Sequence, residues 1–221
     1  MILPSFVVSA DTFDDDLDGM LFPEEEAVIG EAVGKRRREF TTARLCARKA
    51  LRTLGRPPSP ILPGPRGEPR WPAGVVGSIT HCTGYRAAVL GEPSKASAIG
   101  VDAEPNEPLP NGVLEAIALV RERDAVHTLL REHPGIRWDR LLFSAKESVY
   151  KAWFPLTNQW LSFENAAITI DPLKGVFSAR LLVSGPWIDG RRLTGFSGRW
   201  IVGHGLILTS IVVPTPVMAH R

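Results

Sequence analysis

The chain has 221 residues, 44% of them hydrophobic and 23% charged, which is an ordinary globular balance. This length allows one large domain or two small ones, and it can bury a core without disulfides or a structural metal. The formal net charge of +2 is small for a dedicated nucleic-acid binder, so we expect no nucleic-acid partner. No apolar run approaches the roughly 18 residues of a membrane span, and residues 1–18 lack the basic flank of a signal peptide. We therefore expect a cytoplasmic protein without a membrane partner.

The first part of the chain is predicted to be helical. Pro23 and the three glutamates after it form a favourable start, since proline fits the first turn and acids there complement the helix dipole. Helical character extends to residue 54, with a break allowed at Gly34, and the Gly- and Pro-rich residues 55–58 end it. Residues 57–72 are rich in Pro and Gly and are predicted to form an ordered loop.

Strands and a second helical region follow, so the expected fold class is α+β. Asp139 is a candidate cap for one of these helices, and Pro155 is predicted to end it. The last hairpin is predicted to turn at Gly203-His204-Gly205. The predicted elements are strands over 75–80, 86–91 and 98–103, helices over 113–130 and 139–153, strands over 166–170 and 176–183, and a hairpin over 198–213.

A Pro-rich connection over residues 106–112 is the predicted boundary between two halves. We expect an N-terminal half over 1–105, a C-terminal half over 106–213 and a frayed tail over 214–221. Both halves place helices before strands, so two similar α/β halves are permitted, although the sequence shows no clear repeat.

The two cysteines, Cys46 and Cys82, are expected to be free thiols. They show neither metal-ligand spacing nor a CxxC pattern. An unpaired cysteine of this kind is more often a small buried side chain than a functional group.

The first acidic motif is the Asp-x-Glu pair Asp102 and Glu104, at the end of the strand predicted over 98–103. Residues i and i+2 of a strand point to the same face, so both carboxylates can approach one point. Two such carboxylates repel each other unless a cation or a proton lies between them. The alternative is a solvated acidic loop, which is the more common meaning of such a pair taken alone.

The second acidic motif is Glu147 with Lys151, in the helix predicted over 139–153. The two residues are four apart and share a helix face, so the alternative is an ordinary surface ion pair. With Asp102 and Glu104, Glu147 would supply three hard oxygen ligands, which suit an Mg²⁺ ion that also holds a phosphate. The spacing alone does not bring the three carboxylates together.

Four segments match the patterns of a known family. Residues 100–104 read Gly-Val-Asp-Ala-Glu, and residues 143–152 read Phe-Ser-Ala-Lys-Glu-Ser-Val-Tyr-Lys-Ala. Residues 35–40, Lys-Arg-Arg-Arg-Glu-Phe with Arg44 behind them, and residues 77–82, Gly-Ser-Ile-Thr-His-Cys, agree as well. In this order and combination the chain resembles the Sfp-type 4′-phosphopantetheinyl transferases, especially their actinobacterial branch. The likeness extends from about Phe22 to Val213.

The resemblance implies a monomer of two similar halves related by pseudo-twofold symmetry, with the active site between them. The implied activity is transfer of the 4′-phosphopantetheine moiety of coenzyme A to a serine of apo acyl or peptidyl carrier proteins, giving holo-carrier and 3′,5′-ADP. The pathways served would be fatty acid, polyketide or non-ribosomal peptide biosynthesis. Mg²⁺ is the implied metal, with Mn²⁺ as an alternative.

By the same resemblance, Asp102, Glu104 and Glu147 correspond to the metal ligands, with the Ala103 carbonyl as an addition. Glu147 is the implied general base. Lys151 is implied to neutralise or protonate the leaving phosphate. Lys146 is offset from Lys151's face by about a third of a turn and is expected to contact a phosphate.

Further residues correspond to the coenzyme A site. Arg36 and Arg44 match residues that hold the 3′-phosphate, a role that suits a planar guanidinium; without the family they would be solvated helix residues. Thr80 and His81 match the site beside the phosphates, although a lone histidine after a strand is more often structural.

Two more segments of the coenzyme A site are implied. Pro63, Gly64, Pro65 and Arg66 match the loop along the adenine and ribose. Relatives can carry a lysine where Pro63 stands, and Arg66 is the candidate replacement for it. Trp160 matches a residue flanking the pantetheine channel, with core packing as the alternative.

Three other functions stay open. A non-catalytic coenzyme A or carrier-binding protein could keep this fold, an Mg²⁺ enzyme could hydrolyse another nucleotide pyrophosphate, and the basic run Lys35 to Arg38 could bind nucleic acid. The carrier itself is not identified by the sequence. Residues 113–119 and 131–137 are the candidate segments for its docking surface.

Overall fold

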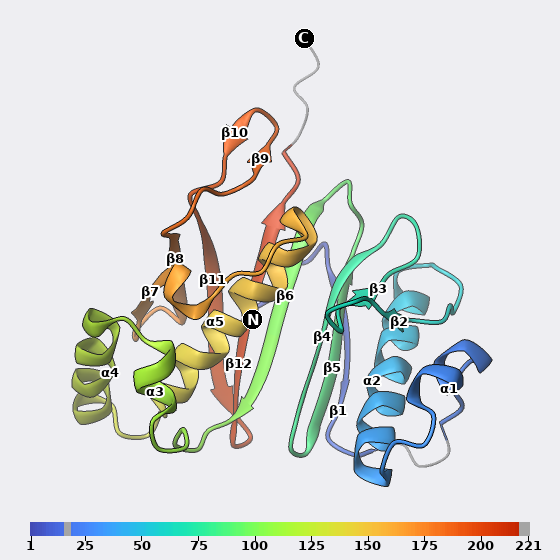
Figure 1. Cartoon of the computed structure of the whole chain (residues 1–221), viewed down its shortest axis with the longest axis horizontal. Coiled ribbons are helices and arrows are strands. Elements are labelled where there is room, and N and C mark those ends of the chain that lie inside the picture. Colours follow the sequence, from blue (N-terminus) through green and yellow to red (C-terminus); the bar gives the residue numbers. More distant parts are fainter. Residues whose placement is uncertain (16–18, 217–221) are drawn as a thin grey trace.

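The structure, a computed structural model, describes residues 1–15 and 19–216. Its larger strands form two sheets, each with a long helix packed against it (Figure 1). The α+β class expected from the sequence is confirmed. Within the described ranges, no helix is long and apolar enough to cross a membrane.

The N-terminal sheet has three antiparallel strands in the order β1-β5-β4. A helix, α2, packs against it through small buried side chains such as Ala43, Ala47 and Ala50. The break allowed at Gly34 is real, because α1 ends at Ile29 and α2 begins at Gly34. β1 and the short β2–β3 hairpin, inside the predicted loop, were not predicted. The bounds are β1 (Val8–Thr12), α1 (Pro23–Ile29), α2 (Gly34–Thr53), β2 (Leu62–Pro63), β3 (Pro69–Arg70), β4 (Val76–Cys82) and β5 (Tyr85–Gly91).

The C-terminal sheet has five antiparallel strands in the order β6-β12-β11-β8-β7, and α5 packs against it. The single helix predicted over 113–130 is two helices, because Ala118 adopts an extended conformation between them. The bounds are β6 (Ala96–Pro105), α3 (Val113–Ile117), α4 (Val120–Glu132), α5 (Trp138–Thr157), the 3₁₀ turn η1 (Phe163–Asn165), β7 (Ala166–Asp171), β8 (Val176–Leu181), β9 (Trp187–Ile188), β10 (Arg191–Arg192), β11 (Gly195–Gly203) and β12 (Leu206–Pro214).

Both predicted ends of the α5 helix were wrong. Arg137, not Asp139, is the N-cap residue, and the Asp139 carboxylate instead accepts a hydrogen bond from the Leu109 backbone N–H at 2.8 Å. Pro155 lies inside the helix, which ends only at Asn158, in the left-handed conformation. A proline removes one backbone donor, and near the end of a long packed helix that loss does not stop the last turn.

Strand β6 joins the two sheets. It pairs with β12 along its whole length, so a strand assigned to the N-terminal half lies in the C-terminal sheet. It is held to β4 by side chains: Ser78 Oγ accepts from the Val101 N–H at 3.1 Å, and Thr80 Oγ1 accepts from the Ala103 N–H at 3.0 Å. These hydroxyls satisfy buried backbone donors that no β4–β6 ladder would otherwise pair.

Helix α5 lies very close to β6. A Cβ added to Gly100 would lie 2.1 Å from the Ser148 carbonyl oxygen, so only glycine allows this approach. On the neighbouring strand, Thr209 Oγ1 lies 2.6 Å from Ser148 Oγ and donates to the Ser144 carbonyl at 3.0 Å. Small and hydroxyl side chains therefore set the distance between α5 and the sheet.

A buried glutamate anchors the short helix before each long helix. In α1, Glu25 is 0% exposed and forms an ion pair of 2.7 Å with Arg48 of α2. Its carboxylate also accepts from the backbone N–H groups of Phe22, at the helix start, and Ile61, just before β2. A buried charge is tolerated only when it is paired and hydrogen-bonded in this way.

The second such glutamate is Glu122 of α4. It forms an ion pair of 3.0 Å with Lys146 of α5. Its carboxylate accepts from the backbone N–H groups of Leu119, at the helix start, and Ile168, in β7. Glu122 therefore makes the same three kinds of contact in the C-terminal half that Glu25 makes in the N-terminal half.

Candidate active site

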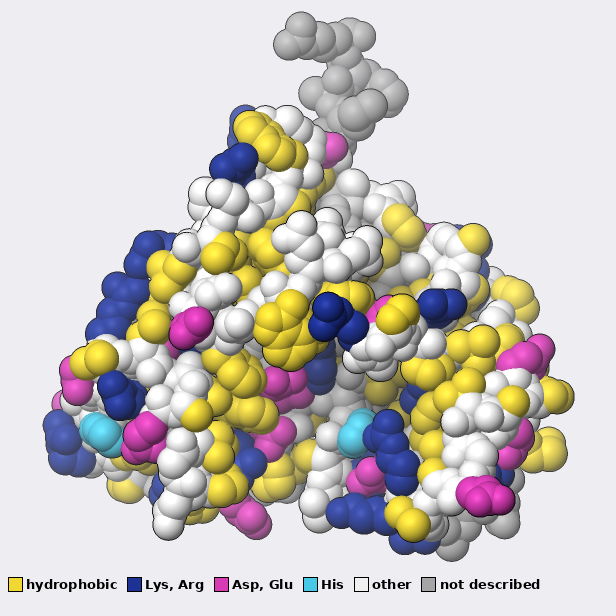
Figure 2. All heavy atoms as spheres, in the orientation of Figure 1, with side chains coloured by type: hydrophobic (Ala, Val, Ile, Leu, Met, Phe, Trp, Pro, Cys, Tyr) yellow, Lys and Arg dark blue, Asp and Glu magenta, His cyan; other side chains and the backbone are white. Residues whose placement is uncertain are grey.

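A cavity of about 840 Å³ is lined by residues of α2 and β4 and, facing them, of β6 and α5. Figure 2 shows this face of the molecule hollowed, with acidic side chains gathered on the α5 side. The cavity brings together residues that the sequence analysis singled out in widely separated segments. They are Arg36, Arg44, Pro63, Arg66, Thr80, His81, Asp102, Glu104, Glu147 and Lys151.

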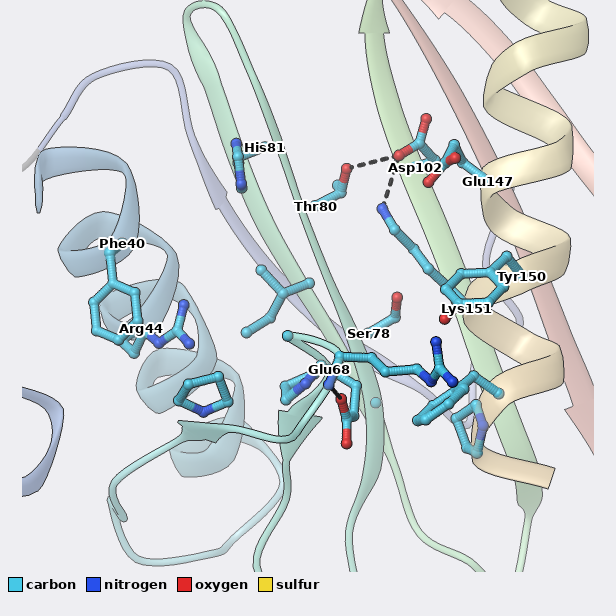
Figure 3. Close-up of a pocket in the computed structure, with 18 of the residues that line it drawn as sticks. Phe40, Arg44, Glu68, Ser78, Thr80, His81, Asp102, Glu147, Tyr150 and Lys151 are labelled. Atoms are coloured by element: carbon cyan, nitrogen blue, oxygen red, sulfur yellow. Dashed lines mark hydrogen bonds and ion pairs between the residues drawn. The ribbon is translucent and has the colours of Figure 1, made fainter. Parts of the chain in front are cut away.

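Asp102 is the centre of the polar network in the cavity. Its Oδ1 accepts from Lys151 Nζ at 2.7 Å and from Thr80 Oγ1 at 3.3 Å (Figure 3). Lys151 also donates to the Val101 carbonyl at 3.0 Å. The helix face shared by Glu147 and Lys151 therefore points into the cavity, and Lys151 pairs with Asp102 rather than with Glu147.

One oxygen of this network has no protein partner. Asp102 Oδ2 is buried and accepts no hydrogen bond from the residues that the structure describes. Figure 3 shows Glu147 beside Asp102, on the facing turn of α5. Burial first, and then the negative charge of Asp102, raises the pKa of Glu147, whereas Lys151 opposes that rise. A buried carboxylate oxygen without a donor, beside a second carboxylate, is a place where a cation would be stabilised.

Glu104 is held differently from the other two carboxylates. Its Oε2 accepts from Arg140 at 2.9 Å, and Arg140 is itself anchored by the carbonyls of Glu107 and Pro108. Burial and the charge of Asp102 raise the pKa of Glu104, and Arg140 lowers it.

The expected convergence of three carboxylates is therefore only partly seen. Over residues 1–15 and 19–216, no three Asp, Glu, His or Cys side chains lie close enough to hold a metal ion. Asp102 and Glu147 fit a hard divalent cation by chemistry and by the unsatisfied oxygen. Ala103, whose carbonyl was an expected addition, is 1% exposed and is not among the residues lining the cavity.

The opposite wall carries two arginines from α2. Arg36 and Arg44 are eight residues apart, close to two helical turns, and both line the cavity. Arg44 is buried, its Nε donates to the Ile61 carbonyl at 3.2 Å, and its guanidinium stacks 3.5 Å from the Phe40 ring centroid. Burial lowers the pKa of Arg44 to about 10, which leaves it charged at neutral pH. This wall therefore presents fixed positive charge to an anion.

Thr80 and His81 lie between the two walls, on β4. Thr80 is buried and bridges Asp102 and Ala103, whereas His81 is an exposed residue on the cavity wall. Withdrawal of water by the surrounding walls is the main cause that lowers the pKa of His81. The charge of Glu39 raises this pKa, and the cations Lys151, Arg36 and Arg86 lower it.

Residues 24–91 match the sequence model of the 4′-phosphopantetheinyl transferase N-terminal domain, and residues 98–190 match that of the 4′-phosphopantetheinyl transferase superfamily. The chain belongs to this superfamily. The family expected from the sequence is confirmed.

Three similar proteins come from actinobacteria, as the resemblance implied. The chain is 53% identical over 218 residues to 4′-phosphopantetheinyl transferase Svp of Streptomyces mobaraensis, covering 97% of this chain and 89% of that one. It is 52% identical over 196 residues to 4′-phosphopantetheinyl transferase PptT of Mycobacterium tuberculosis (86% and 85% covered). It is 48% identical over 218 residues to 4′-phosphopantetheinyl transferase Npt of Nocardia iowensis (95% and 97% covered).

In this phosphopantetheinyl transferase, Lys146 does not face the cavity, so the expectation that it contacts a phosphate is contradicted. Its side chain is 2% exposed, and its ammonium group pairs with Glu122. It also donates to the carbonyls of Phe163 at 2.7 Å and Ala166 at 2.9 Å. All three donor positions of the ammonium group are used, so Lys146 is a structural residue of the C-terminal half.

For Trp160, the alternative of core packing is wrong. This residue is 60% exposed, so it is not a core residue. The indole packs against Tyr150, with ring centroids 4.9 Å apart, and lies 5.8 Å from the guanidinium carbon of Arg66. Of the loop expected along the adenine, Pro63 and Arg66 line the cavity, and Gly64 and Pro65 are absent from its lining.

The sequence analysis missed several lining residues of this transferase. Tyr150 and Phe154 follow Glu147 at intervals of three and seven, a spacing that places them on its helix face. Their position on that face was a signal that could have been used. Glu68 also lines the cavity, and its carboxylate accepts from the backbone N–H of Arg66, two residues earlier. Arg140, which holds Glu104 at the edge of the site, gave no signal, because the fold brings it to a residue 36 positions away.

Proposed function

We propose that this chain transfers 4′-phosphopantetheine from coenzyme A to a serine of an apo carrier protein and releases 3′,5′-ADP. The observation that carries the proposal is the set of groups gathered in one cavity. Arg36 and Arg44 line one wall, the Asp102–Lys151 pair lies on the opposite side, and Tyr150 and Phe154 add aromatic side chains to the lining. Coenzyme A carries the matching groups: a phosphorylated nucleotide, a pyrophosphate and a flexible, largely neutral arm.

The nucleotide would bind at the basic wall. Arg44 is held by Phe40 and the Ile61 carbonyl, so its guanidinium is already oriented for a phosphate. Arg36 is exposed and would close on the phosphate from the cavity rim. His81, on the wall of the same cavity, would donate to a pyrophosphate oxygen.

Mg²⁺, or Mn²⁺ as an alternative, is proposed as the metal, and when bound it would offset the charge of the pyrophosphate. Asp102 and Glu147 would hold it, because Asp102 Oδ2 is an unsatisfied buried oxygen and the two side chains are neighbours. Glu104 is the proposed third ligand. Its carboxylate would either bind the metal while still paired with Arg140 or break that ion pair.

In the reaction, the carrier serine oxygen would form a bond to the β-phosphorus of coenzyme A. The bond from that phosphorus to the bridging oxygen would break, and 3′,5′-ADP would leave. Glu147 would accept the serine proton, directly or through a water molecule, and its raised pKa suits a base. Lys151 would offset the charge that develops on the leaving phosphate.

The test mixes the protein with coenzyme A, Mg²⁺ and apo carrier proteins of the fatty-acid, polyketide and peptide-synthetase types. A mass gain of one phosphopantetheine on a carrier serine supports the proposal. The absence of a gain on every one of these carriers would contradict it. The same assay without Mg²⁺, in the presence of a chelator, tests the metal.

Glu147→Gln tests the base. This variant should still bind coenzyme A but lose most of its turnover, on the order of 100-fold or more for a general base. Single-turnover transfer assays measure the turnover, and calorimetry measures the binding of coenzyme A. Turnover near that of the wild type would remove Glu147 from the mechanism.

We also infer that the halves, 1–105 and 106–213, are related by pseudo-twofold symmetry. The support is the repeated glutamate anchor: Glu25 and Glu122 each sit in the first turn of a short helix and pair with a cation on the 20-residue helix that follows. Each also accepts from a backbone N–H at or just before the next strand. Scattering from the protein in solution would test the further proposal that it is a monomer.

A further inference from the structure

A contact between the two halves crosses the mouth of the cavity. Arg66 lies at the tip of the β2–β3 hairpin of the N-terminal half, and Trp160 lies just after α5 in the C-terminal half. The guanidinium carbon of Arg66 is 5.8 Å from the centroid of the Trp160 ring, within the range of a cation–π contact. Arg66 also lines the cavity, so this contact lies at its edge.

Each partner is held in place by its own half. The hairpin tip is a formed turn: the Arg66 N–H donates to the Glu68 carboxylate at 2.9 Å, and the Gly64 N–H donates to the Glu68 carbonyl at 2.7 Å. Gly67, with a φ of +85°, allows the chain to reverse there. The tip therefore presents Arg66 without help from the other half.

Trp160 is supported in the same way from below. Its ring packs on Tyr150, the Trp153 indole N–H donates to the carbonyl of Gln159 at 2.9 Å, and Leu161 is buried. The backbone on either side of Trp160 is thus fixed, while Trp160 itself is 60% exposed. An exposed indole leaves apolar surface in contact with water. The packing on Tyr150 leaves one face of the Trp160 ring for a partner.

The contact is weak enough to open. Across the described ranges, no hydrogen bond or ion pair joins residues 62–70 to residues 138–161. An exposed cation–π contact is worth about 0.5–1 kcal/mol. The two halves are thus joined at this point by side-chain tips alone, and a ligand could enter and leave when they separate.

We propose that Arg66 and Trp160 form a clasp over the cavity that retains bound coenzyme A, opening to admit it and closing above it. The proposal rests on the function proposed above. The clasp touches no reacting atom, so both are positioning residues. Because their contact is formed without coenzyme A as well, they would slow both the entry and the loss of coenzyme A.

The test is a double-mutant cycle of Arg66→Ala, Trp160→Ala and both together. Coenzyme A affinity is measured by calorimetry and its dissociation rate by stopped-flow displacement, without a carrier. We expect each single variant to release coenzyme A and to take it up about threefold to fivefold faster, as the loss of up to about 1 kcal/mol from the closed contact implies. The double variant should be no faster than the faster single one.

The matched control is Arg192→Ala. The Arg192 guanidinium lies 5.3 Å from the Trp187 ring centroid in the β9–β10 hairpin, outside the cavity. The substitution therefore removes the same kind of contact and should leave coenzyme A binding unchanged. Arg66→Lys keeps the charge but loses the planar stack, and it should resemble Arg66→Ala.

Additive effects in the cycle would overturn the clasp, because they would mean two independent contacts. So would full activity of Arg66→Lys with a strong salt dependence, since Arg66 would then act as a charge on a phosphate. Binding is measured without a carrier. A cycle that behaves as expected while no carrier is loaded would therefore refute the proposed function and leave the clasp standing.

Discussion

At the residue scale, each charged side chain of the cavity has its role set by its neighbours. Lys146 and Lys151 are five residues apart in one motif, yet Lys146 is enclosed by Glu122 and two carbonyls, and Lys151 reaches Asp102 in the cavity. Asp102 and Glu104 belong to one short motif as well, but Asp102 keeps a free oxygen and Glu104 is tied to Arg140. The two members of each pair carry the same charge within one motif, and their surroundings give them different roles.

His81 gives a pH prediction at this scale. The pKa of His81 is lowered in the free protein, chiefly by withdrawal of water; Glu39 opposes this, and Lys151, Arg36 and Arg86 add to it. A bound phosphate would stabilise the protonated ring and raise that pKa, so binding should take up part of a proton. Coenzyme A affinity should therefore fall as pH rises through the pKa of His81 in the complex.

The measurement is calorimetry over a series of pH values, in buffers of different ionisation enthalpy at each pH. His81→Gln should abolish the buffer dependence. Proton uptake that persists in this variant would assign the titration to another group.

At the element scale, α5 carries the site and the core on different faces. Its buried face includes Leu141, Ala145, Val149 and Ala152, and its cavity face includes Glu147 and Lys151. Both faces were expected from the 3.6-residue period, because an apolar stripe fixes which residues point away from it. The close approach of α5 to β6 depends on Gly100, which that period does not reveal.

Lys146→Met should destabilise the fold. It would leave the Glu122 carboxylate buried beside Leu119 and Ile168 without its cation, a loss of about 3–5 kcal/mol in the free energy of unfolding. Urea denaturation measures it. Adding Glu122→Gln should recover part of the loss, whereas a stable Lys146→Met protein with weak coenzyme A binding would restore the phosphate role that the structure contradicts.

Gly100→Ala should also destabilise the fold. The new Cβ would lie 2.1 Å from the Ser148 carbonyl oxygen, so α5 would have to move from β6 and carry Glu147 and Lys151 away from Asp102. We expect a loss of about 1–3 kcal/mol and a larger relative loss of turnover. Gly135→Ala is the control, because its Cβ would meet nothing within 4 Å; equal effects of the two substitutions would contradict the packing argument.

At the scale of the whole molecule, two sheets meet at β4 and β6 through hydroxyl groups rather than through a ladder. Thr80 has two tasks at this junction: its Oγ1 accepts from the Ala103 N–H and donates to Asp102. The junction therefore holds the halves together and orients the central carboxylate of the cavity.

Thr80→Val keeps the shape of the side chain and removes the hydroxyl. A buried N–H and Asp102 would each lose a partner, so we expect a loss of about 1–3 kcal/mol in stability and a lower turnover. Thermal unfolding and the transfer assay measure the two effects. Thr53→Val is the control, since its hydroxyl makes an exposed contact within α2. An unchanged stability of Thr80→Val would show that the junction does not depend on this hydroxyl.

Local sequence determined the elements and the candidate residues. Most helices and strands follow from periodicity and from Gly and Pro signals, although β1, the split between α3 and α4, and the passage of α5 through Pro155 escaped them. The Asp-x-Glu pair and the Glu147–Lys151 pair were each visible as motifs, because their geometry depends on the period of one strand or one helix.

Tertiary structure alone decided which of these residues meet. Whether Lys151 pairs with Glu147 or with Asp102, whether Lys146 faces the cavity, and whether Arg66 reaches Trp160 all depend on how α5 packs on β6 and how the hairpin faces α5. The period of a helix fixes the relative direction of its own side chains, but the partner of each one comes from a distant part of the chain. For this protein, the sequence determined the family and the chemical groups, and the packing of the two halves decided their arrangement.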